Sequence, residues 1–264
     1  MRVLFWNTHN NVEINPVLSD IILENDINLV LLAEYQADVN ELISNLHQRG
    51  CHMKKCLGCN RLTVLSDISE LEPGTQDDYY SFQLLPNSLI VCCVHLPSKI
   101  YGSNSEARKA IINRMNRDVK ETEINNNTEN TVIVGDFNLD PFENECISVN
   151  HLNSIPFCGI ARNDSRTIAG ESFKMFYNPM WRFLGDYQKP FGTLFYHGTS
   201  GDNIYWHIFD QVMIRPCLRP RFVDESLQII TDTVNCSLVD RKGYPDVDRL
   251  SDHLPITFEI QEEV

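Results

Sequence analysis

Several short apolar runs in this sequence lead directly into an amide, carboxylate or imidazole side chain, and this repeated pattern constrains the fold more than any other feature. The runs with their polar residues are 4–7 (LFWN), 31–34 (LLAE), 91–95 (VCCVH), 132–138 (VIVGDFN) and 208–210 (IFD), and the polar triplet 251–253 (SDH) directly precedes a further apolar run. Continuous apolar runs of this length are typical of buried strands. Because strand ends converge at one edge of a sheet, we expect these polar side chains to gather in a single cleft.

Strands are predicted at 2–6, 28–33, 62–65, 88–95, 131–134, 206–214, 227–231 and 255–260. Between them, residues 16–26, 36–49 and 107–119 place apolar side chains at helical spacing. Alternating strands and helices are typical of an α/β domain. We therefore predict one domain over residues 1–264, with a loop-rich, aromatic insertion at about 160–204 that shows no clean period.

The composition argues against two broad classes of protein. Hydrophobic residues make up 42% of the chain, which is too many for wholesale disorder. No stretch approaches the roughly 20 apolar residues that a membrane span needs. The first run is too short for the apolar part of a secretory signal, so we expect a cytoplasmic protein with no membrane span.

The formal net charge of −14 counts against broad, salt-driven binding of nucleic acid. It does not exclude a nuclease, because a site that gathers carboxylates for a metal ion is itself acidic. A local basic patch could still hold a phosphate backbone.

The nine cysteines are an odd number and are scattered, which favours free thiols in a reducing compartment. Cys56 and Cys59 have the spacing of a zinc knuckle, and Cys51 and His52 lie nearby. No second Cys/His pair follows at finger spacing, so a reduced loop and a structural zinc site both stay open.

The polar residues also resemble a known family in their order along the chain. WN, E, H, GDFN, D and SDH follow one another from Asn7 to His253, as in the endonuclease/exonuclease/phosphatase superfamily, which includes apurinic endonucleases, deoxyribonuclease I and inositol-polyphosphate phosphatases. The resemblance implies a deoxyribonuclease I-like, four-layer α/β/β/α sandwich with two mixed sheets. It also implies a metal-dependent hydrolase acting on ester bonds.

Three residues are predicted to bind the metal ion, Mg²⁺ or Mn²⁺. Glu34 is the strongest candidate, because a hard cation prefers carboxylate oxygen and needs few protein ligands besides water. Asp252 offers a second carboxylate, directly or through water. Asn7 offers an amide oxygen without adding charge.

Asp136 and Asn138 are predicted to act on the substrate. Residues two apart in a strand face the same side, so both would point into the cleft while Phe137 packs behind them. Asp136 can orient or deprotonate the attacking water, and Asn138 can donate to a phosphate oxygen as charge builds up in the transition state.

His253 is the expected partner of Asp210, since a carboxylate at one ring nitrogen fixes the tautomer and leaves the other nitrogen for the phosphate. Whether His253 acts as a base or as a protonated clamp stays open. His95 is predicted to contact a phosphate oxygen or the leaving group.

The substrate-binding residues are predicted from less specific signals. His9 stands where the family often has Asp, and with Asn10 it is expected to contact the substrate. Arg162 and Arg182 lie in the aromatic insertion, where arginine and aromatic side chains together suit a nucleic-acid strand. The alternative is that these aromatics form the core of a loop-rich subdomain.

The leading hypothesis is therefore a nuclease that hydrolyses phosphodiester bonds of DNA or RNA. A phosphatase or phosphodiesterase for a small molecule, nucleotide or lipid headgroup needs the same core chemistry and is the alternative. A third possibility is a non-catalytic binding module with the same fold, although binding alone would not need a water activator and a paired histidine.

Overall fold

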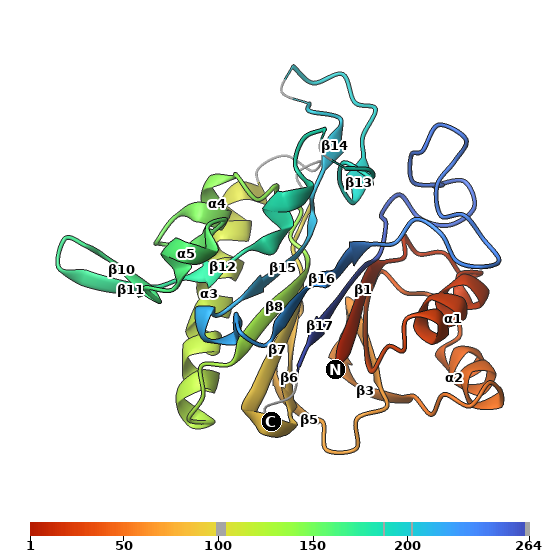
Figure 1. Ribbon diagram of the computed structural model, residues 1–264, viewed down its shortest axis with the longest axis horizontal. Coiled ribbons are helices and arrows are strands. Elements are labelled where there is room, and N and C mark those ends of the chain that lie inside the picture. Colours follow the sequence, from red (N-terminus) through yellow and green to blue (C-terminus); the bar gives the residue numbers. More distant parts are fainter. Residues whose placement is uncertain (99–103, 187, 202, 262–264) are drawn as a thin grey trace.

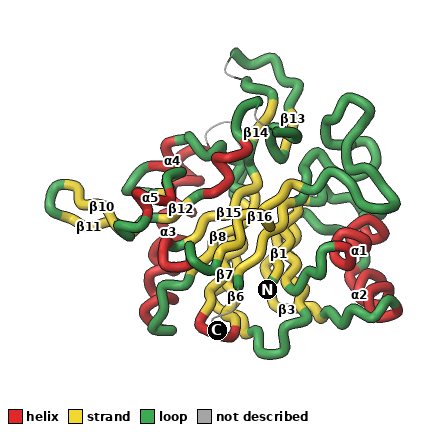
Figure 2. The backbone as a smooth tube through the Cα atoms, viewed as in Figure 1, coloured by secondary structure: helices red, strands yellow, loops and turns green. Residues whose placement is uncertain are grey.

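The computed structural model describes residues 1–98, 104–186, 188–201 and 203–261. Two β-sheets face each other at the centre of the molecule, and helices lie outside them (Figure 1). Helices α1 (Asn15–Glu24) and α2 (Val39–Gln48) lie outside the first sheet, whereas α3 (Asn104–Asn125), α4 (Asn144–Ile147) and α5 (Cys158–Ala161) lie on the side of the second. The tube in Figure 2 shows the same order of helix, sheet, sheet and helix. The predicted α/β/β/α sandwich is confirmed.

The first sheet has six strands in the order β16-β17-β1-β2-β4-β3. These are β1 (Arg2–Asn7), β2 (Leu29–Ala33), β3 (Lys54–Cys59), β4 (Leu62–Ser66), β16 (Phe222–Ile229) and β17 (Ile256–Ile260). β1 and β2 are parallel and connected through α1, while the other neighbours are antiparallel. The sheet is therefore mixed.

The second sheet has seven strands in the order β5-β6-β7-β8-β15-β12-β9. These are β5 (Glu72–Gln76), β6 (Tyr80–Leu85), β7 (Leu89–His95), β8 (Thr131–Asp136), β9 (Ser154–Ile155), β12 (Phe176–Tyr177) and β15 (Asp210–Ile214). β7 and β8 are parallel and connected through α3, and β15 runs antiparallel to β8. Short 3₁₀ helices lie at Pro86–Ser88, Pro179–Phe183 and Pro216–Leu218.

Successive side chains of the central strands point to opposite faces of the sheet, and this divides the apolar core into two parts. In β7, Val91 and Cys93 belong to the cluster between the two sheets, whereas Cys92 and Val94 belong to the cluster under α3. Successive side chains of a strand point to opposite faces, so a strand covered on both faces must be apolar throughout. This explains the continuous apolar runs that end at the polar residues.

The insertion predicted at about 160–204 contains short paired segments. Residues 187 and 202 of this range lie outside the described residues. A hairpin of β10 (Ser165–Ile168) and β11 (Glu171–Lys174) projects from the sandwich (Figure 1). Further along, β13 (Leu194–Phe195) pairs with β14 (Trp206–His207) beyond the end of the sheets where β15 begins. The prediction of one strand over 206–214 is wrong, because β14 and β15 are separate strands in different sheets.

No helix in the described parts of the chain combines the length and apolar character needed to cross a membrane.

Candidate active site

Three strands of the second sheet bring polar residues to one edge. Asp136, the last residue of β8, lies opposite His95 at the end of β7 and opposite Asp210 at the start of β15. β1 of the facing sheet ends at Asn7, and the chain turns sharply at Glu34 just after β2. The predicted convergence of strand ends is thus present in the structure.

Gly135 allows β8 to approach β7 just before the site. Its φ is +155°, and a Cβ atom placed there would lie 1.9 Å from the carbonyl oxygen of Val94. Only glycine fits at this position, so the glycine of the GDFN sequence is explained by strand packing. Glu34 and Asn138 also have positive φ, 50° and 49°, a conformation that is uncommon for residues with a side chain and that often marks functional sites.

Asp136 is the residue that the other side chains surround. Its Oδ2 accepts from Nδ2 of Asn7 at 3.0 Å and from Nδ2 of Asn138 at 3.2 Å, and its Oδ1 accepts from the Asn138 backbone N–H at 2.8 Å. Nε2 of His95 and Nε2 of His253 lie 3.7 and 3.9 Å from the same Oδ2. With Asp136 only 1% exposed, its carboxylate is fixed in a buried, polar environment.

Asn138 is fully engaged in holding this arrangement. Its Nδ2 donates to the Leu96 carbonyl at 2.9 Å and to Asp136 Oδ2. Both amide hydrogens are therefore used within the protein. The arrangement does not support the predicted donation from Asn138 to a phosphate oxygen, and instead gives Asn138 a role in orienting Asp136.

His253 forms the expected pair with Asp210. Its Nδ1 lies 2.8 Å from Oδ2 of Asp210. The backbone around His253 is held as well, because Trp6 Nε1 donates to its carbonyl at 2.8 Å and Ser251 Oγ accepts from its N–H at 3.0 Å. Ser251 Oγ also donates to the carbonyl of Asn7, which connects the SDH sequence to the end of β1.

The charges of this cluster shift the pKa values of its members. Burial alone would lower the pKa of His253, but the carboxylates of Asp210 and Asp136 outweigh it and raise the pKa to about 10. The pKa of Asp136 is raised, mainly by burial and also by Asp210, against the opposing effect of the nearby histidines. In the absence of other ligands, His253 is therefore an imidazolium at neutral pH, and Asp136 is more basic than a surface carboxylate.

Two further carboxylates lie at the rim of the cluster. Glu34 Oε1 lies 3.5 Å from His95 Nε2, and Glu34 Oε2 accepts from Asn10 Nδ2 at 2.8 Å. Asp252 Oδ1 lies 3.1 Å from His9 Nδ1. The side chains of Glu34 and Asp252 are 30% and 33% exposed, so both can reach a ligand that enters from solvent.

The donor set suits a hard divalent cation. Carboxylate and amide oxygens dominate, and Oδ1 of the fully buried Asp210 has no hydrogen-bond partner in the protein. Within the described residues, the ligand atoms of Asp136, Asp210 and His253 form the one group of three or more His, Cys, Asp or Glu residues that lie within 4.8 Å of one another. Cys51, Cys56 and Cys59 do not come together in this way, and all nine cysteines are free.

Comparison with solved structures decides what fold this is. The structure superposes on an AP endonuclease from Archaeoglobus fulgidus with a TM-score of 0.61 and 12% sequence identity, over 99% of this chain and 100% of that chain. A 3′-5′ exonuclease from Neisseria meningitidis gives a TM-score of 0.61 at 14% identity, over 99% and 100% of the two chains. An endonuclease/exonuclease/phosphatase family protein from Bacteroides thetaiotaomicron gives 0.57 at 12% identity, over 98% and 97%.

The chain has the endonuclease/exonuclease/phosphatase fold. No family model matches its sequence, and no curated protein is significantly similar to it. At these identities the similarity establishes the fold, and the activity has to be inferred from the site.

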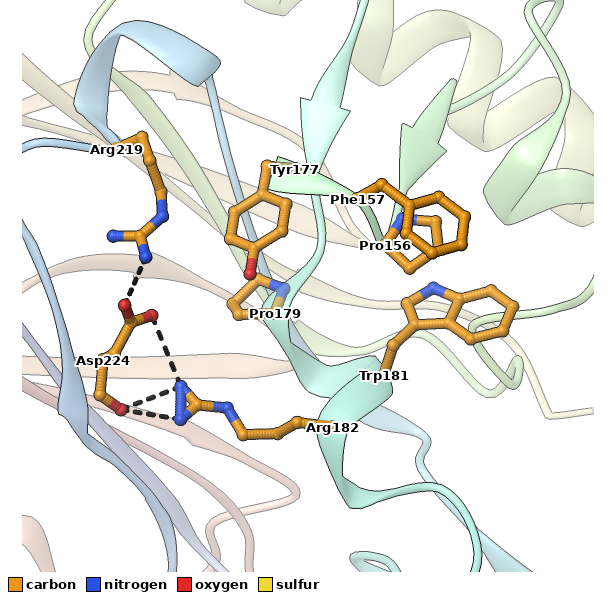
Figure 3. A pocket seen from close by; sticks show the side chains of 8 residues that line it. All are labelled: Pro156, Phe157, Tyr177, Pro179, Trp181, Arg182, Arg219 and Asp224. Atoms are coloured by element: carbon orange, nitrogen blue, oxygen red, sulfur yellow. Dashed lines mark hydrogen bonds and ion pairs between the residues drawn. The ribbon is translucent and has the colours of Figure 1, made fainter. Parts of the chain in front are cut away.

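Two of the predicted site residues lie elsewhere on the endonuclease/exonuclease/phosphatase fold. Arg182 donates to the backbone carbonyl of Asp224 at 2.8 Å and lies 3.5 Å from its carboxylate (Figure 3). This pair lines a separate cavity of about 810 Å³ together with Tyr177, Trp181 and Arg219. Arg162 is exposed at the end of α5. The structure therefore does not bring Arg162 or Arg182 to the carboxylate cluster.

Residues of the insertion reach the site through β13, which the sequence did not indicate. Thr193 Oγ1 accepts from the backbone N–H of Asp210 at 3.2 Å, and the Thr193 carbonyl accepts from the N–H of Leu254 at 2.7 Å. Leu194 forms an isolated bridge with His253. A two-residue strand has too short a pattern to be recognised, so only the fold reveals this contact.

Aromatic side chains of the insertion pack on one another. Phe195 stacks on Tyr244 with a centroid distance of 3.8 Å and an interplanar angle of 13°, and it meets Trp206 edge-on at 5.2 Å. These contacts attach β13 and β14 to the loop that carries Tyr244. They favour the alternative in which the aromatics form a small core of their own.

Proposed function

We propose that this protein is a divalent-metal-dependent phosphoesterase and that its substrate is a phosphodiester bond of DNA or RNA. The observation that supports this most strongly is the buried carboxylate of Asp136, whose Oδ2 lies 3.7 Å from Nε2 of His95 and 3.9 Å from Nε2 of His253. A carboxylate in this position can take a proton from water, while a protonated His253 beside it stabilises the charge that develops on a phosphate oxygen.

The proposed roles follow from the hydrogen bonds. Asn7 and Asn138 orient the carboxylate of Asp136, whose raised pKa suits it as a general base. Asp210 holds Nδ1 of His253, so that Nε2 remains to donate to the phosphate. Between the two roles considered for His253, the two carboxylates around it favour the protonated clamp.

Asn7, Glu34 and Asp252 would hold Mg²⁺ or Mn²⁺, with water completing the coordination. When bound, the cation polarises the phosphoryl group and neutralises its charge. His9 and Asn10 contact Asp252 and Glu34, so we propose that they position these carboxylates beside the substrate. His95, which lies between Glu34 and Asp136, is in place to contact a phosphate oxygen or the leaving group.

A nucleic-acid substrate is supported by the similarity to an AP endonuclease and a 3′-5′ exonuclease. The alternative is a small-molecule, nucleotide or lipid-headgroup phosphoester, which the net charge of −14 favours because such a substrate needs no extended basic surface. We also propose a cytoplasmic location, since nine free thiols suit a reducing compartment.

The test is an activity panel with Mg²⁺, Mn²⁺ or EDTA over plasmid DNA, single-stranded DNA, RNA, nucleotides and phospholipid headgroup esters. We expect metal-dependent cleavage of a nucleic acid. Asp136→Asn should lower kcat at least about a thousandfold, as expected when a general base and its electrostatic contribution are lost. Asp78→Asn, at an exposed aspartate, is the matched control and should keep full activity.

Intact nucleic acids together with hydrolysis of a small phosphoester would replace the nuclease proposal by the alternative. If no substrate turns over with any metal, the chain is not a phosphoesterase, and a binding module would explain the fold better.

A further inference from the structure

A second Asp–His pair lies beside the proposed site and has no role in the chemistry described above. Nδ1 of His207 lies 2.7 Å from Oδ2 of Asp140, nearly the same separation as the 2.8 Å between His253 and Asp210. A second imidazole held by a carboxylate is therefore a candidate functional group.

β13 places the two histidines on the same side of the chain. Leu194 lies opposite His207 on one side and opposite His253 on the other, antiparallel in both cases. Directly opposed residues of antiparallel strands project to the same face. With neighbouring strands about 4.8 Å apart, the backbones of His207 and His253 are roughly 10 Å apart. The side chains of His207 and His253 therefore project from the same face of β13 and its two neighbours.

The surrounding hydrogen bonds fix the His207 ring. Asp140 is buried, its Oδ1 accepts from the N–H of Ile208 at 2.9 Å, and its own N–H donates to Glu143 Oε1 at 2.8 Å. The Asp140 carboxylate cannot turn away from His207 without losing its bond to the Ile208 N–H. His207 is thus oriented before any substrate binds, which lowers the entropic cost of a contact.

The other ring nitrogen of His207 also faces an acceptor. Nε2 lies 3.4 Å from Oδ1 of Asn203, and that oxygen already accepts from the N–H of Tyr205 at 2.9 Å. The Asn203 amide nitrogen donates to the carbonyls of Tyr196 and Gly198, which fixes the orientation of the amide. Only an imidazolium has donors at both nitrogens, so this arrangement suits a cation. The bond to Asn203 is long, and an anionic acceptor would give a stronger one.

A polynucleotide bound at the proposed site would need a positively charged group beside each phosphate that the site contacts. The ion pairs of the carboxylate cluster, taken over the described residues, join histidines to carboxylates and include no lysine or arginine. His207 is 14% exposed at its side chain, so a ligand can reach it. An imidazolium at this position would supply a positive charge that lysine and arginine do not supply to the cluster.

We propose that Asp140 and His207 form a binding subsite for the phosphate next to the one that is hydrolysed. This inference rests on the proposed function and narrows it, because it requires a substrate with consecutive phosphodiesters. The substrate class is a polynucleotide, and His207 is a specificity-determining residue for it.

The experiment compares two substrates, a single-stranded oligonucleotide and the p-nitrophenyl ester of thymidine 5′-monophosphate, which has one phosphodiester and no neighbouring phosphate. His207→Ala should raise KM for the oligonucleotide about tenfold, the usual effect of one charge-assisted hydrogen bond, with kcat little changed. Turnover of the small ester should stay within about twofold. His52→Ala, at an exposed histidine far from the cluster in sequence, is the matched control.

Salt dependence gives a second readout that a purely structural role would not move. Losing one phosphate contact should reduce the slope of log kcat/KM against log salt by about 0.7 for a single strand. Asp140→Asn, which keeps an acceptor for the Ile208 N–H, should produce the same change even if His207→Ala folds poorly.

Equal loss on both substrates, or no loss on either, would overturn the subsite. If the wild-type protein cleaves the small ester but no oligonucleotide, both the subsite and the nuclease proposal fail. If it cleaves the oligonucleotide and His207→Ala does so equally well, only the subsite fails.

Discussion

At the scale of single residues, the site depends on the electrostatic interaction between Asp136 and His253, because each residue affects the pKa of the other. Asp136 ends β8 of the second sheet, whereas His253 lies shortly before β17 of the first sheet. The two residues are 117 positions apart in the sequence, yet Oδ2 of Asp136 and Nε2 of His253 lie 3.9 Å apart. Burial makes a carboxylate in this position basic, and the histidine offsets part of the cost of burying it. This pairing lets one residue accept a proton while the other remains a cation.

This pairing predicts a pH dependence of stability in EDTA. The pKa of His253 is raised from its ordinary 6.5 to about 10, so its protonated form contributes stability that is fully present below pH 6.5. That contribution is lost as the pH rises through about 10. The melting temperature of the wild type should therefore fall towards that of His253→Gln between pH 7 and pH 10.5. Thermal unfolding of both proteins at several pH values measures this, and a constant difference across the range would contradict it.

The sequence located most residues of the cluster because each one ends or begins an apolar run. Asn7, His95, Asp136 and Asp210 all lie at strand termini, where the change from apolar to polar is visible. The position of Arg182 could not be predicted, because its partner Asp224 lies on a strand 42 residues further along the chain. Side-chain partners across such separations depend on how strands from the two sheets meet.

At the scale of elements, the junction of β7 and β8 positions His95 beside Asp136. Gly135 allows the backbone of β8 to lie close to the backbone of β7 at Val94. Gly135→Ala would force a Cβ atom against the Val94 carbonyl, and we expect a loss of about 3 kcal/mol in the free energy of unfolding, the upper end for overpacking. Urea denaturation measures the effect.

Gly159→Ala is the matched control for this substitution. A Cβ atom at Gly159 meets nothing within 4 Å, so the change should be neutral or stabilise by up to about 1 kcal/mol. If both variants unfold at the same urea concentration, the strand junction does not have the tight packing described here.

The central strands were predicted well, and the strands that were missed have a physical reason. β6 carries Ser81 and Gln83 at fully buried positions, where Gln83 donates to the Leu57 carbonyl and to Ser81 Oγ. These bonds satisfy the buried amide nitrogen of Gln83, but polar residues at these positions leave no apolar signal in the sequence. The break between β14 and β15 also leaves no signal in the sequence. The N–H of Ile208 donates to Asp140, which lies in a distant loop, instead of to a neighbouring strand.

At the scale of the whole molecule, the sandwich brings the ends of two sheets together. The first sheet provides Asn7 and the neighbouring Glu34, while the second provides His95, Asp136 and Asp210. Neither sheet alone has both the proposed metal ligands and the proposed base. The overall architecture could be expected from the order of the sequence patterns, whereas the short pairing of β13 with His253 needed the folded chain.

Glu34→Gln tests the central claim most directly, because it removes one proposed metal ligand while leaving Asp136 and His253 in place. The measurement is the rate of oligonucleotide cleavage as Mg²⁺ is titrated into metal-free protein, with Glu171→Gln, at an exposed position on the projecting hairpin, as control. We predict that Glu34→Gln needs at least about tenfold more Mg²⁺ for half-maximal rate and that the control titrates as the wild type does. An unchanged Mg²⁺ requirement in Glu34→Gln would contradict a shared cation site at the meeting point of the two sheets.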